Sequence, residues 1–514
     1  MKQLFCLLLI SLPGFSQTTS TPSMTDRAAA RFLDQATWGA TPDSIAALER
    51  MGIAEWLKWQ FSAKPSDLPD QPILASNGDS NTNLAPVQAA FFQNTVNGPD
   101  QLRQRVAFVL SQIWVVSQTT VPEAYAFPPY WRIFRNNAFR NYRDIVKAVT
   151  LSPAMGTYLN MANNNKANAS KGTAANENYA RELMQLFTMG LNELNSDGSP
   201  VLDSSNNPVP TYNQAVVTNM AKVLTGWTYP TAPGATAKTN NPAYYFGQMF
   251  AVETEHDTTA KAIFNNLTIP AGQTAEQDLD TLFDDLMAQP TMAPFVSRQL
   301  IQHLVTSNPS PAYIQRISQV FTSTNGDMKS MVTAILTDPE ARAGDDAGTP
   351  VNPSFGHLRE PILFLSSLLR GLNATVGPSN SLNGYSQELG QNLFVAPSVF
   401  SYFSPQNQIG EGLLGPEFQI YSTQTASDRA NIVSTALYGA LDKTTTMDLS
   451  PFVGMAGNVS GMVNYIGYVF LHSGMSPALT QAATGAANAQ STALAKAQAA
   501  LYVVLASNEY QVIH

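Results

Sequence analysis

The dominant pattern along the chain is the helical spacing of its apolar residues. In residues 176–189, apolar side chains recur at i, i+3, i+4 and i+7 from Ala180 onward, which predicts one amphipathic helix. Gly190 then supplies a natural C-terminal cap. The same pattern predicts helices over 42–51, 53–61, 86–96, 102–117, 130–150, 213–224, 278–287, 293–305, 312–321, 328–336, 358–370 and 478–504.

Turn-forming residues separate these helices and predict a small β component. Asp197-Gly198 and residues 206–208 flank a short apolar pair, which is typical of a hairpin. A second β ribbon is expected near residues 244–252, and residues 376–414, rich in Asn, Ser, Gly and Pro, predict long ordered loops. The expected fold class is mainly α: a large multi-helix globular protein with one or two small β-hairpins and long ordered loops.

The length of the chain points to more than one region. At 514 residues it exceeds the roughly 250–300 residues at which a single hydrophobic core stops growing. We expect an N-terminal helical region over 25–230 and an irregular, partly β connection over 231–290. A C-terminal helical region would then occupy 291–514.

The N-terminus has the layout of a secretory signal. Lys2 provides positive charge, and the apolar run 4–12 is far shorter than the ~20 residues needed to span a bilayer. We expect a signal peptide over 1–20, with cleavage after Ser16 or Ser20 left open; a buried N-terminal helix is the structural alternative. The one cysteine, Cys6, lies in the apolar run, so the mature chain would be cysteine-free. The expected product is exported, periplasmic or extracellular, without a membrane span.

Composition narrows the classes of partner. Lys and Arg total 28 against 37 for Asp and Glu, giving a net charge of −9 with no continuous basic run, so nucleic acid is not an expected partner. Charged residues make up only 13% of the chain, against about 25% in average soluble domains. The 44% of apolar residues excludes disorder throughout, and the surface must be rich in uncharged polar side chains.

The first candidate site lies on the 176–189 helix. Glu177 and Arg181 form an i, i+4 acid–base pair at the margin of the buried face, and Glu182 follows. The structural interpretation is a helix-start ion pair worth about 0.2–0.5 kcal/mol. The functional interpretation makes Glu177 or Glu182 a divalent metal ligand or general base oriented by Arg181. Five positions turn the two carboxylates about 140° apart, so both cannot easily hold one ion from this helix alone.

A second candidate is a stripe of positive charge. Arg132, Arg135, Arg140 and Arg143 fall within about 140° of arc on the expected 130–150 helix. They could hold an anionic ligand or form ion pairs with the carboxylates of the first candidate site. A solvated charged face is the structural interpretation.

The third candidate is His256-Asp257, which follows Glu253 and Glu255. An acidic cluster with one imidazole suits a divalent cation or an acid–base pair. Alternatively, the segment is a polar loop in which Asp257 caps a helix that contains Lys261.

Familiar catalytic motifs are absent from the sequence. The other histidines are isolated, with no His-x-x-x-His and no His-Glu-x-x-His, and His303 on its apolar helix is interpreted as structural. Neither a Gly-x-Ser-x-Gly elbow nor a phosphate-binding loop occurs, and the glycines of 410–415 lack the strand that a dinucleotide turn needs. No cofactor other than a divalent metal is indicated.

Several spaced segments match one protein family. They are 28–42 (AAARFLDQATWGATP), 176–183 (NENYAREL), 224–227 (LTGW), 256–257 (HD), 294–301 (PFVSRQLI), 358–361 (LREP) and 396–400 (APSVF). Together they resemble the bacterial exported family catalogued as domain of unknown function 1800, over roughly 27–512 as one continuous domain. The resemblance implies an α-helical exported protein. Such proteins are often encoded beside an exported partner of the alkaline phosphatase and sulfatase group, which implies joint action.

The chain departs from this family in one helix. Many relatives carry Trp-His-Asn-His-Phe where residues 110–114 read Leu-Ser-Gln-Ile-Trp, so Ser111 and Ile113 replace both imidazoles. Gln289 likewise stands where relatives often have a histidine. If the family's histidines bind metal, part of that site is missing here.

Two functional hypotheses follow. The first is a non-enzymatic binding or scaffold partner at the cell envelope, for the phosphatase-like neighbour or for cell-surface polymers. The second is a carboxylate-dependent hydrolase, with or without a metal. In it Glu177 and Glu182 act as acid–base groups or ligands, Arg181 holds an anionic group, and His256 with Asp257 completes the site. Whether the protein is an enzyme stays open at this point.

Overall fold

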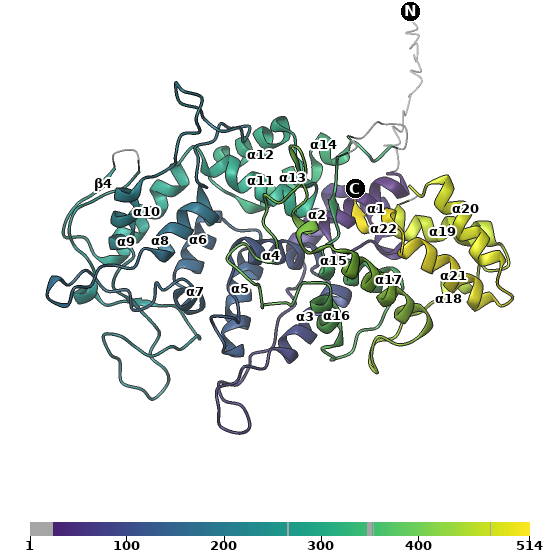
Figure 1. Ribbon diagram of the computed structural model, residues 1–514, viewed down its shortest axis with the longest axis horizontal. Helices are drawn as coiled ribbons and strands as arrows, with labels where there is room; N and C mark the ends of the chain where they lie inside the picture. The colour runs from purple at the N-terminus through teal and green to yellow at the C-terminus, as the bar shows by residue number, and fades with distance from the viewer. Residues whose placement is uncertain (1–23, 265–266, 347–351, 353, 473) are drawn as a thin grey trace, which may run out of the picture.

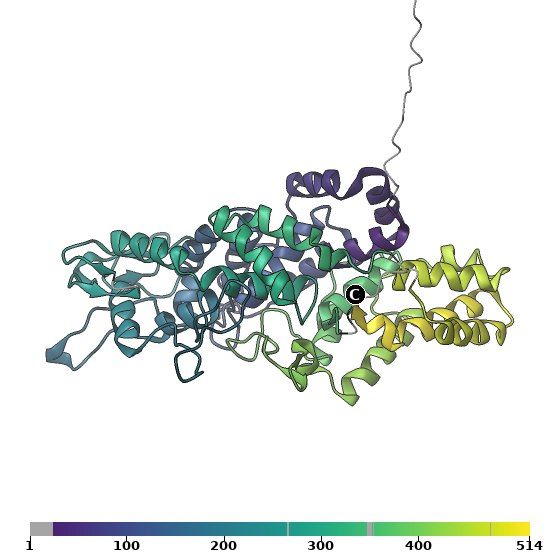
Figure 2. The same cartoon turned by 90° about the horizontal axis from the view of Figure 1, so that it is seen from above.

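The computed structural model describes residues 24–264, 267–346, 352, 354–472 and 474–514. The expected signal peptide and Cys6 lie outside these residues. The helices build an elongated body in which α6, α8, α9 and α10 form one end, α4, α5 and α11–α13 the middle, and α18–α21 the other end (Figure 1). The view from above shows the same order along the long axis (Figure 2).

The first part of the chain supplies the middle of the body. Its helices are α1 (Asp26–Ala36), α2 (Pro42–Ser62), α3 (Ala85–Asn97), α4 (Gln101–Ile113) and α5 (Phe127–Asn137). Aromatic rings join them: Trp38 packs on Phe91 and Phe108, and Phe91 packs edge-on against Trp131. This cluster anchors α4, whose last residues Gln112 and Ile113 line a cleft.

The next part forms one end of the body around short sheets. The elements are α6 (Tyr142–Thr150), α7 (Pro153–Tyr158), α8 (Asn178–Glu182), the π-helix η3 (Leu183–Thr188), α9 (Gln214–Val223) and α10 (Ala275–Ala288). Strand β1 (Trp227–Thr228) pairs antiparallel with β2 (Phe250–Ala251), and β3 (Lys261–Ala262) with β4 (Thr268–Ile269). Between η3 and α9, a ribbon is closed by the bridges Leu194↔Pro200 and Leu202↔Pro208.

The remaining helices return through the middle to the far end. They are α11 (Met292–Leu304), α12 (Pro311–Ser323), α13 (Met328–Thr337), α14 (Pro339–Arg342), α15 (Pro361–Gly371), α16 (Ser381–Glu388), α17 (Thr423–Tyr438), α18 (Ser450–Val453), α19 (Val459–Leu471), α20 (Pro477–Asn488), α21 (Ala493–Leu505) and α22 (Asn508–Gln511). Strand β5 (His357–Leu358) pairs with β8 (Val512–Ile513), and β6 (Gln408–Gly410) with β7 (Leu413–Leu414). The C-terminus thereby ends beside α1 (Figure 1).

The mainly-α prediction and the small hairpins are confirmed, with four corrections to the elements. The helix expected over 176–189 is the short α8 followed by the π-helix η3. The expected 130–150 helix is two helices, because Asn141 is extended and its side chain accepts the Arg143 N–H as a new N-cap. The expected 478–504 helix is likewise α20 and α21. Lys261 lies on strand β3, so the helix that Asp257 was expected to cap does not form. No helix of the described ranges combines the length and hydropathy needed to cross a bilayer.

A candidate ligand-binding cleft

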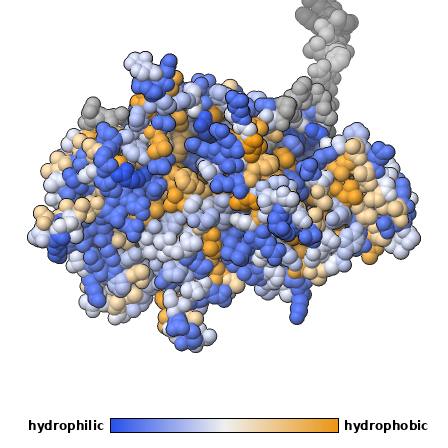
Figure 3. All heavy atoms as spheres, viewed as in Figure 1, coloured by the Kyte–Doolittle hydropathy of each residue, from blue (hydrophilic) through white to orange (hydrophobic). Residues whose placement is uncertain are grey.

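A cleft of about 720 Å³ lies in the middle of the body. One wall is α11, and the opposite walls are the end of η3, the ribbon that follows it and the loop around residues 399–406. Figure 3 shows apolar surface on the middle of the face viewed in Figure 1. The volume lies within the roughly 300–1,000 Å³ that is usual for ligand sites.

One stripe of α11 lines this cleft. The stripe has the spacing i, i+3, i+4, i+7 and i+8 and consists of Phe295, Arg298, Gln299, Gln302 and His303. The other side of the helix is apolar and buried, as Val296, Leu300 and Leu304 illustrate. Because residues at this spacing share one helix face, the sequence of α11 separates a core side from a polar cleft side.

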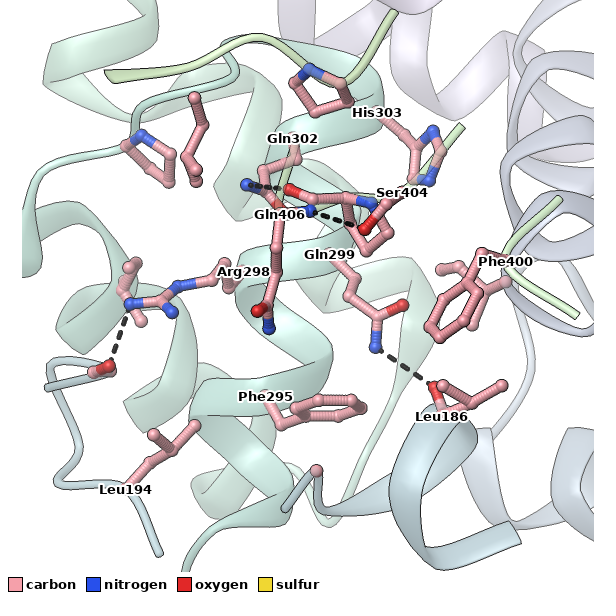
Figure 4. Close-up of a pocket in the computed structure, with 18 of the residues that line it drawn as sticks. Leu186, Leu194, Phe295, Arg298, Gln299, Gln302, His303, Phe400, Ser404 and Gln406 are labelled. Atoms are coloured by element: carbon pink, nitrogen blue, oxygen red, sulfur yellow. Dashed lines mark hydrogen bonds between the residues drawn. The ribbon is translucent and has the colours of Figure 1, made fainter. Parts of the chain in front are cut away.

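Hydrogen bonds from the stripe hold the surrounding loops (Figure 4). Arg298 Nη2 donates to the carbonyl of Gly198 at 2.8 Å, and Gln302 Nε2 donates to the carbonyl of Ser307 at 3.1 Å. Gly190 has φ of +78°, and a Cβ there would lie 2.8 Å from the Phe295 ring. A glycine is therefore needed where the chain leaves η3 and passes over this ring.

Buried polar groups form the inner end of the cleft. Gln112 and Glu417 line it. His357 Nδ1 lies 3.1 Å from Glu417 Oε1, and Gln112 Nε2 donates to Glu360 Oε1 at 3.2 Å. Arg105, fully buried, donates through Nη2 to the His303 carbonyl at 2.6 Å and lies 4.0 Å from Glu360. We call these five residues with His303 the inner polar cluster.

Several atoms of the inner polar cluster have no hydrogen-bond partner within the described residues. They are Arg105 Nε and Nη1, Gln112 Oε1, His357 Nε2 and Glu417 Oε2. Buried polar atoms are otherwise almost always paired, because an unpaired one costs about 1–3 kcal/mol. Both donors and acceptors are thus open beside the cleft, a combination that suits a ligand with groups that donate and accept.

The electrostatics keep this end of the cleft nearly neutral. Burial, together with the charges of Arg105 and His357, lowers the pKa of His303 to about 3, so its imidazole is neutral at physiological pH. Burial raises the pKa of Glu360, and the charge of Arg105 opposes that rise. No cluster of three His, Cys, Asp or Glu side chains able to hold a metal occurs in the described ranges.

Glu177 and Arg181 lie outside the cleft, on the partly exposed start of α8. Arg181 Nη2 donates to Glu177 Oε2 at 2.8 Å, and Glu177 also accepts from Gln214 Nε2 and from Thr218 Oγ1. The Gln214 bond foremost, with those of Thr218 and Arg181, lowers the pKa of Glu177. These bonds fasten the start of α8 to α9.

Glu182 lies in a different environment one turn further along. Its Oε2 is buried without a hydrogen-bond partner among the residues the structure describes. Burial raises its pKa, and the charge of Arg181 opposes the rise only in part. Burial foremost, and the charge of Glu182 in addition, raise the pKa of the phenols Tyr158 and Tyr212.

His256 is fully buried and pairs with a residue distant in sequence. Its Nε2 lies 3.0 Å from Asp278 Oδ2, and Lys261 Nζ lies 2.6 Å from the same oxygen. Asp257 instead accepts from the backbone and hydroxyl of Thr259. Within the described ranges no hydrogen bond or ion pair joins His256 to Glu177, Arg181 or Glu182.

The arginine stripe is divided between two helices and is not an anion site. Arg132 and Arg135 form ion pairs with Asp67 and Arg132 with Asp70, in the loop before α3. Arg143 pairs with aspartates of α10. The alternative in which this stripe pairs with the carboxylates of α8 is therefore not supported. Aspartates of other segments pair with Arg132, Arg135 and Arg143, and Arg140 is exposed between α5 and α6.

Sequence reasoning missed the cleft, and His303 was interpreted as structural. Its ring faces the cleft and lies 6.4 Å from that of Phe403. The signal was present in the polar stripe of α11, which an apolar count of that helix overlooks. Ile113, at which relatives were expected to carry an imidazole, also lines the cleft.

Comparison with known proteins gives one match. A family model described as "Protein of unknown function (DUF1800)" matches residues 31–512, nearly the whole chain. No curated protein and no solved structure matches.

Proposed function

The chain belongs to the DUF1800 family of proteins of unknown function, and from that premise we propose that it is a binding protein of the cell envelope. Its cleft holds a segment of a neutral, hydroxyl-rich polymer. The observation that carries this proposal is the α11 stripe, which presents amides and an aromatic ring to a cleft whose inner end has unpaired donors and acceptors.

A neutral ligand fits the charges of the cleft. Uncharged amides are the commonest polar side chains of its wall and include Gln299, Gln302 and Gln406. Glu417 Oε1 is in contact with His357 Nδ1 at 3.1 Å. A charged polymer would meet no concentrated field of opposite sign, whereas amides bind neutral groups without a desolvated ion.

A hydroxyl-rich ligand fits the open atoms. Each hydroxyl group can donate one hydrogen bond and accept others. Hydroxyls can therefore donate to Gln112 Oε1 and Glu417 Oε2, the two unpaired acceptors whose residues line the cleft. The rings of Phe295 and Phe400 border the cleft (Figure 4) and offer apolar faces to the C–H surface of a sugar ring.

A chain-like ligand fits the rim. Large apolar side chains are exposed beside the cleft, with Leu191 56% and Phe400 44% exposed. Exposed apolar groups that gather around an opening mark interaction sites more often than isolated ones do. A polymer that extends beyond the cleft would cover them.

Export and a partner belong to the same proposal. Removal of residues 1–20 would deliver the protein to the periplasm or the cell surface, where such polymers occur. The expected phosphatase- or sulfatase-like partner would act on charged esters of the envelope, while this protein holds the neutral polymer. The short apolar run at the N-terminus and the family resemblance support these two points.

The test is direct binding of neutral oligosaccharides. Isothermal titration calorimetry of the mature protein with six-unit cello-, chito-, xylo- and malto-oligosaccharides is expected to give a Kd of about 1 mM or tighter for at least one series. Phe295→Ala should weaken it at least about tenfold. The matched control is Trp59→Ala, an exposed aromatic of α2 outside the cleft. No binding in any series, or equal loss in both variants, contradicts the proposal.

The second candidate function is the carboxylate-dependent hydrolase. Glu182 favours it, because a half-buried carboxyl group with a raised pKa and an unpaired oxygen is suited to donate a proton. Elemental analysis and an ester and glycoside hydrolysis screen of wild type, Glu182→Gln and Glu177→Ala would test it. The hydrolase is supported if wild type has stoichiometric metal or turnover and both variants lose it. The hydrolase is excluded if wild type has neither metal nor turnover.

A further inference from the structure

A lysine, an aspartate and a histidine meet in the interior between β3 and α10. The side chains of Lys261, Asp278 and His256 are all 0% exposed. Lys261 Nζ lies 2.6 Å and His256 Nε2 lies 3.0 Å from the same oxygen, Asp278 Oδ2. None of the three lines the cleft, so the proposed ligand site does not use them.

The surroundings fix how these groups can share protons. His256 Nδ1 lies 2.9 Å from the Thr225 carbonyl, which can only accept, so Nδ1 carries a proton. Nε2 then either donates to a carboxylate or accepts from a carboxylic acid at Asp278 Oδ2. The imidazole is thus placed to exchange a proton with the carboxyl group that the amine contacts.

The backbone holds this arrangement tightly. Lys261 Nζ also donates to the Thr259 carbonyl at 2.9 Å, which aims the amine along its own strand. Gly226, with φ of +86°, packs so closely on His256 that a Cβ there would lie 2.9 Å from its backbone nitrogen. Asp278 Oδ1 has no partner among the described residues.

An ion pair at this place is costly, since both charges are removed from water. Condensation of the two groups to an amide would remove both charges and leave a neutral group. Contact within a rigid interior supplies the proximity that favours such a reaction over the same reaction in solution. Asp257, held by Thr259, adds negative charge nearby but makes no hydrogen bond to Nζ within the described ranges.

We propose that Lys261 and Asp278 are joined by an intramolecular isopeptide bond that forms after folding. Lys261 Nζ, as the free amine, attacks Cγ of Asp278 in its carboxylic acid form. The Nζ–Cγ bond forms and the Cγ–Oδ2 bond breaks. A proton of Nζ passes to the neutral His256 imidazole, which delivers it to Oδ2, and Oδ2 leaves as water. The sum is one ammonium and one carboxylate converted to one amide and one water, without oxidant or reductant.

Such a bond would serve a region that has little regular structure. The segment between α9 and α10 is held by two-residue strands, and the chain has no cysteine besides Cys6 with which to close a disulfide. A covalent link from β3 to α10 restricts the unfolded chain as a disulfide would.

Trypsin tests the link directly. Lys261 is the one Lys or Arg between Lys238 and Arg298. In denatured wild-type protein, a linked Lys261 resists cleavage, and the expected product is a single fragment 239–298 lighter than its sequence by one water molecule. Separate, full-mass fragments 239–261 and 262–298 would overturn the proposal. This readout does not depend on the position of signal cleavage.

Two variants sharpen the result. Lys261→Arg keeps a cation but removes the amine nucleophile, and trypsin should then release both fragments at full mass. A fragment 239–298 that persists at the reduced mass in this variant would overturn the assignment to Lys261. His256→Gln keeps Lys261 and Asp278, and in freshly synthesised protein it should slow the appearance of the linked fragment at least tenfold. A rate equal to that of wild type would overturn the proton-transfer role of His256.

Discussion

Two buried ionic networks lie in the middle of the molecule, and they differ in how many of their hydrogen-bonding atoms have partners. In the first, Asp34 of α1 accepts from both terminal nitrogens of Arg359 and lies 2.9 Å from His472 Nε2. Arg359 Nε also donates to the carbonyl of Tyr510. Every guanidinium nitrogen of Arg359 thus has a partner, and of the side-chain N and O atoms of Asp34, Arg359 and His472 only His472 Nδ1 is buried without a hydrogen-bond partner in the described residues. The network joins α1 to the C-terminal segment.

The inner polar cluster of the cleft is buried to a similar degree but has open positions. Arg105 uses one nitrogen on the His303 carbonyl, while Nε and Nη1 have no hydrogen-bond partner in the described chain. Glu417 is likewise held through one oxygen only. Buried polar groups that only stabilise a fold are mostly paired, so the larger number of open positions in the inner polar cluster favours this network over the Asp34 network as the one that a ligand completes.

The largest expected effect is a loss of stability when the Asp34 network is broken. Asp34→Asn should lower the free energy of unfolding by about 3–5 kcal/mol, because Arg359 would be left buried without its counter-charge. Urea unfolding of wild type and variant at neutral pH measures this difference. A loss below about 1 kcal/mol, the size of a surface pair, would break the comparison.

The same network should give the protein an acid-dependent stability. Burial alone would raise the pKa of Asp34, but the charges of Arg359 and His472 hold it well below its usual value. The stabilisation is therefore present above the unfolded-state pKa of about 3.9 and is lost as the pH falls below it. Asp34→Asn should flatten this acid limb of the stability curve.

The second-largest expected effect is a loss of ligand affinity when the inner polar cluster is changed. Glu417→Gln keeps the shape of the side chain, so we expect a stability loss of only about 1–2 kcal/mol together with an at least tenfold weaker oligosaccharide affinity. Calorimetric binding and urea unfolding of the same preparation separate the two quantities. A stability loss as large as that of Asp34→Asn, with unchanged affinity, would make the cleft network structural as well.

The contrast also shows what the sequence could and could not reveal. The helical course of the α8–η3 segment and its Gly190 cap follow from local spacing, as do the helices that surround the cleft, but the π-helical form of η3 does not. The cleft itself joins α4, α11 and the loop before η6 (Pro416–Ile420), which are far apart in sequence and meet only through tertiary packing. For the same reason the sequence did not reveal Asp278 as the partner of His256 and pointed instead to the adjacent Asp257.

Two errors had local causes that were visible. Asn141 is an N-cap residue in the middle of the expected 130–150 helix, and it marked the break that divides the arginine stripe. On α11 the regular spacing of amides and His303 marked a polar face, but the surrounding apolar residues dominated the interpretation. Local polar patterns therefore merit the same weight as apolar ones.

A third, smaller effect concerns pH at the cleft. Because the pKa of His303 is lowered to about 3, its imidazole stays neutral in the folded protein, whereas an unfolded histidine titrates near 6.5. Its share of stability is therefore lost as the pH falls below about 6.5, yet ligand affinity should be flat between about pH 5 and pH 8. Affinity that falls with a midpoint near pH 6.5 would show that His303 titrates in the free cleft.

The smallest expected effect is on the exposed pair of α8. Glu177→Gln should change the free energy of unfolding by less than about 1 kcal/mol, because the Arg181 pair is partly solvated and the new amide oxygen can still accept from Thr218. Its oligosaccharide affinity should match that of wild type. A double-mutant cycle with Arg181→Met would measure a coupling of about 0.3–0.5 kcal/mol. If Glu177→Gln instead abolished metal binding or turnover while Glu417→Gln changed nothing, the functional site would lie on the exposed helix. The unpaired atoms of the inner polar cluster would then have no ligand. Function would instead depend on the Glu177–Arg181 pair, whose side chains already bond to each other.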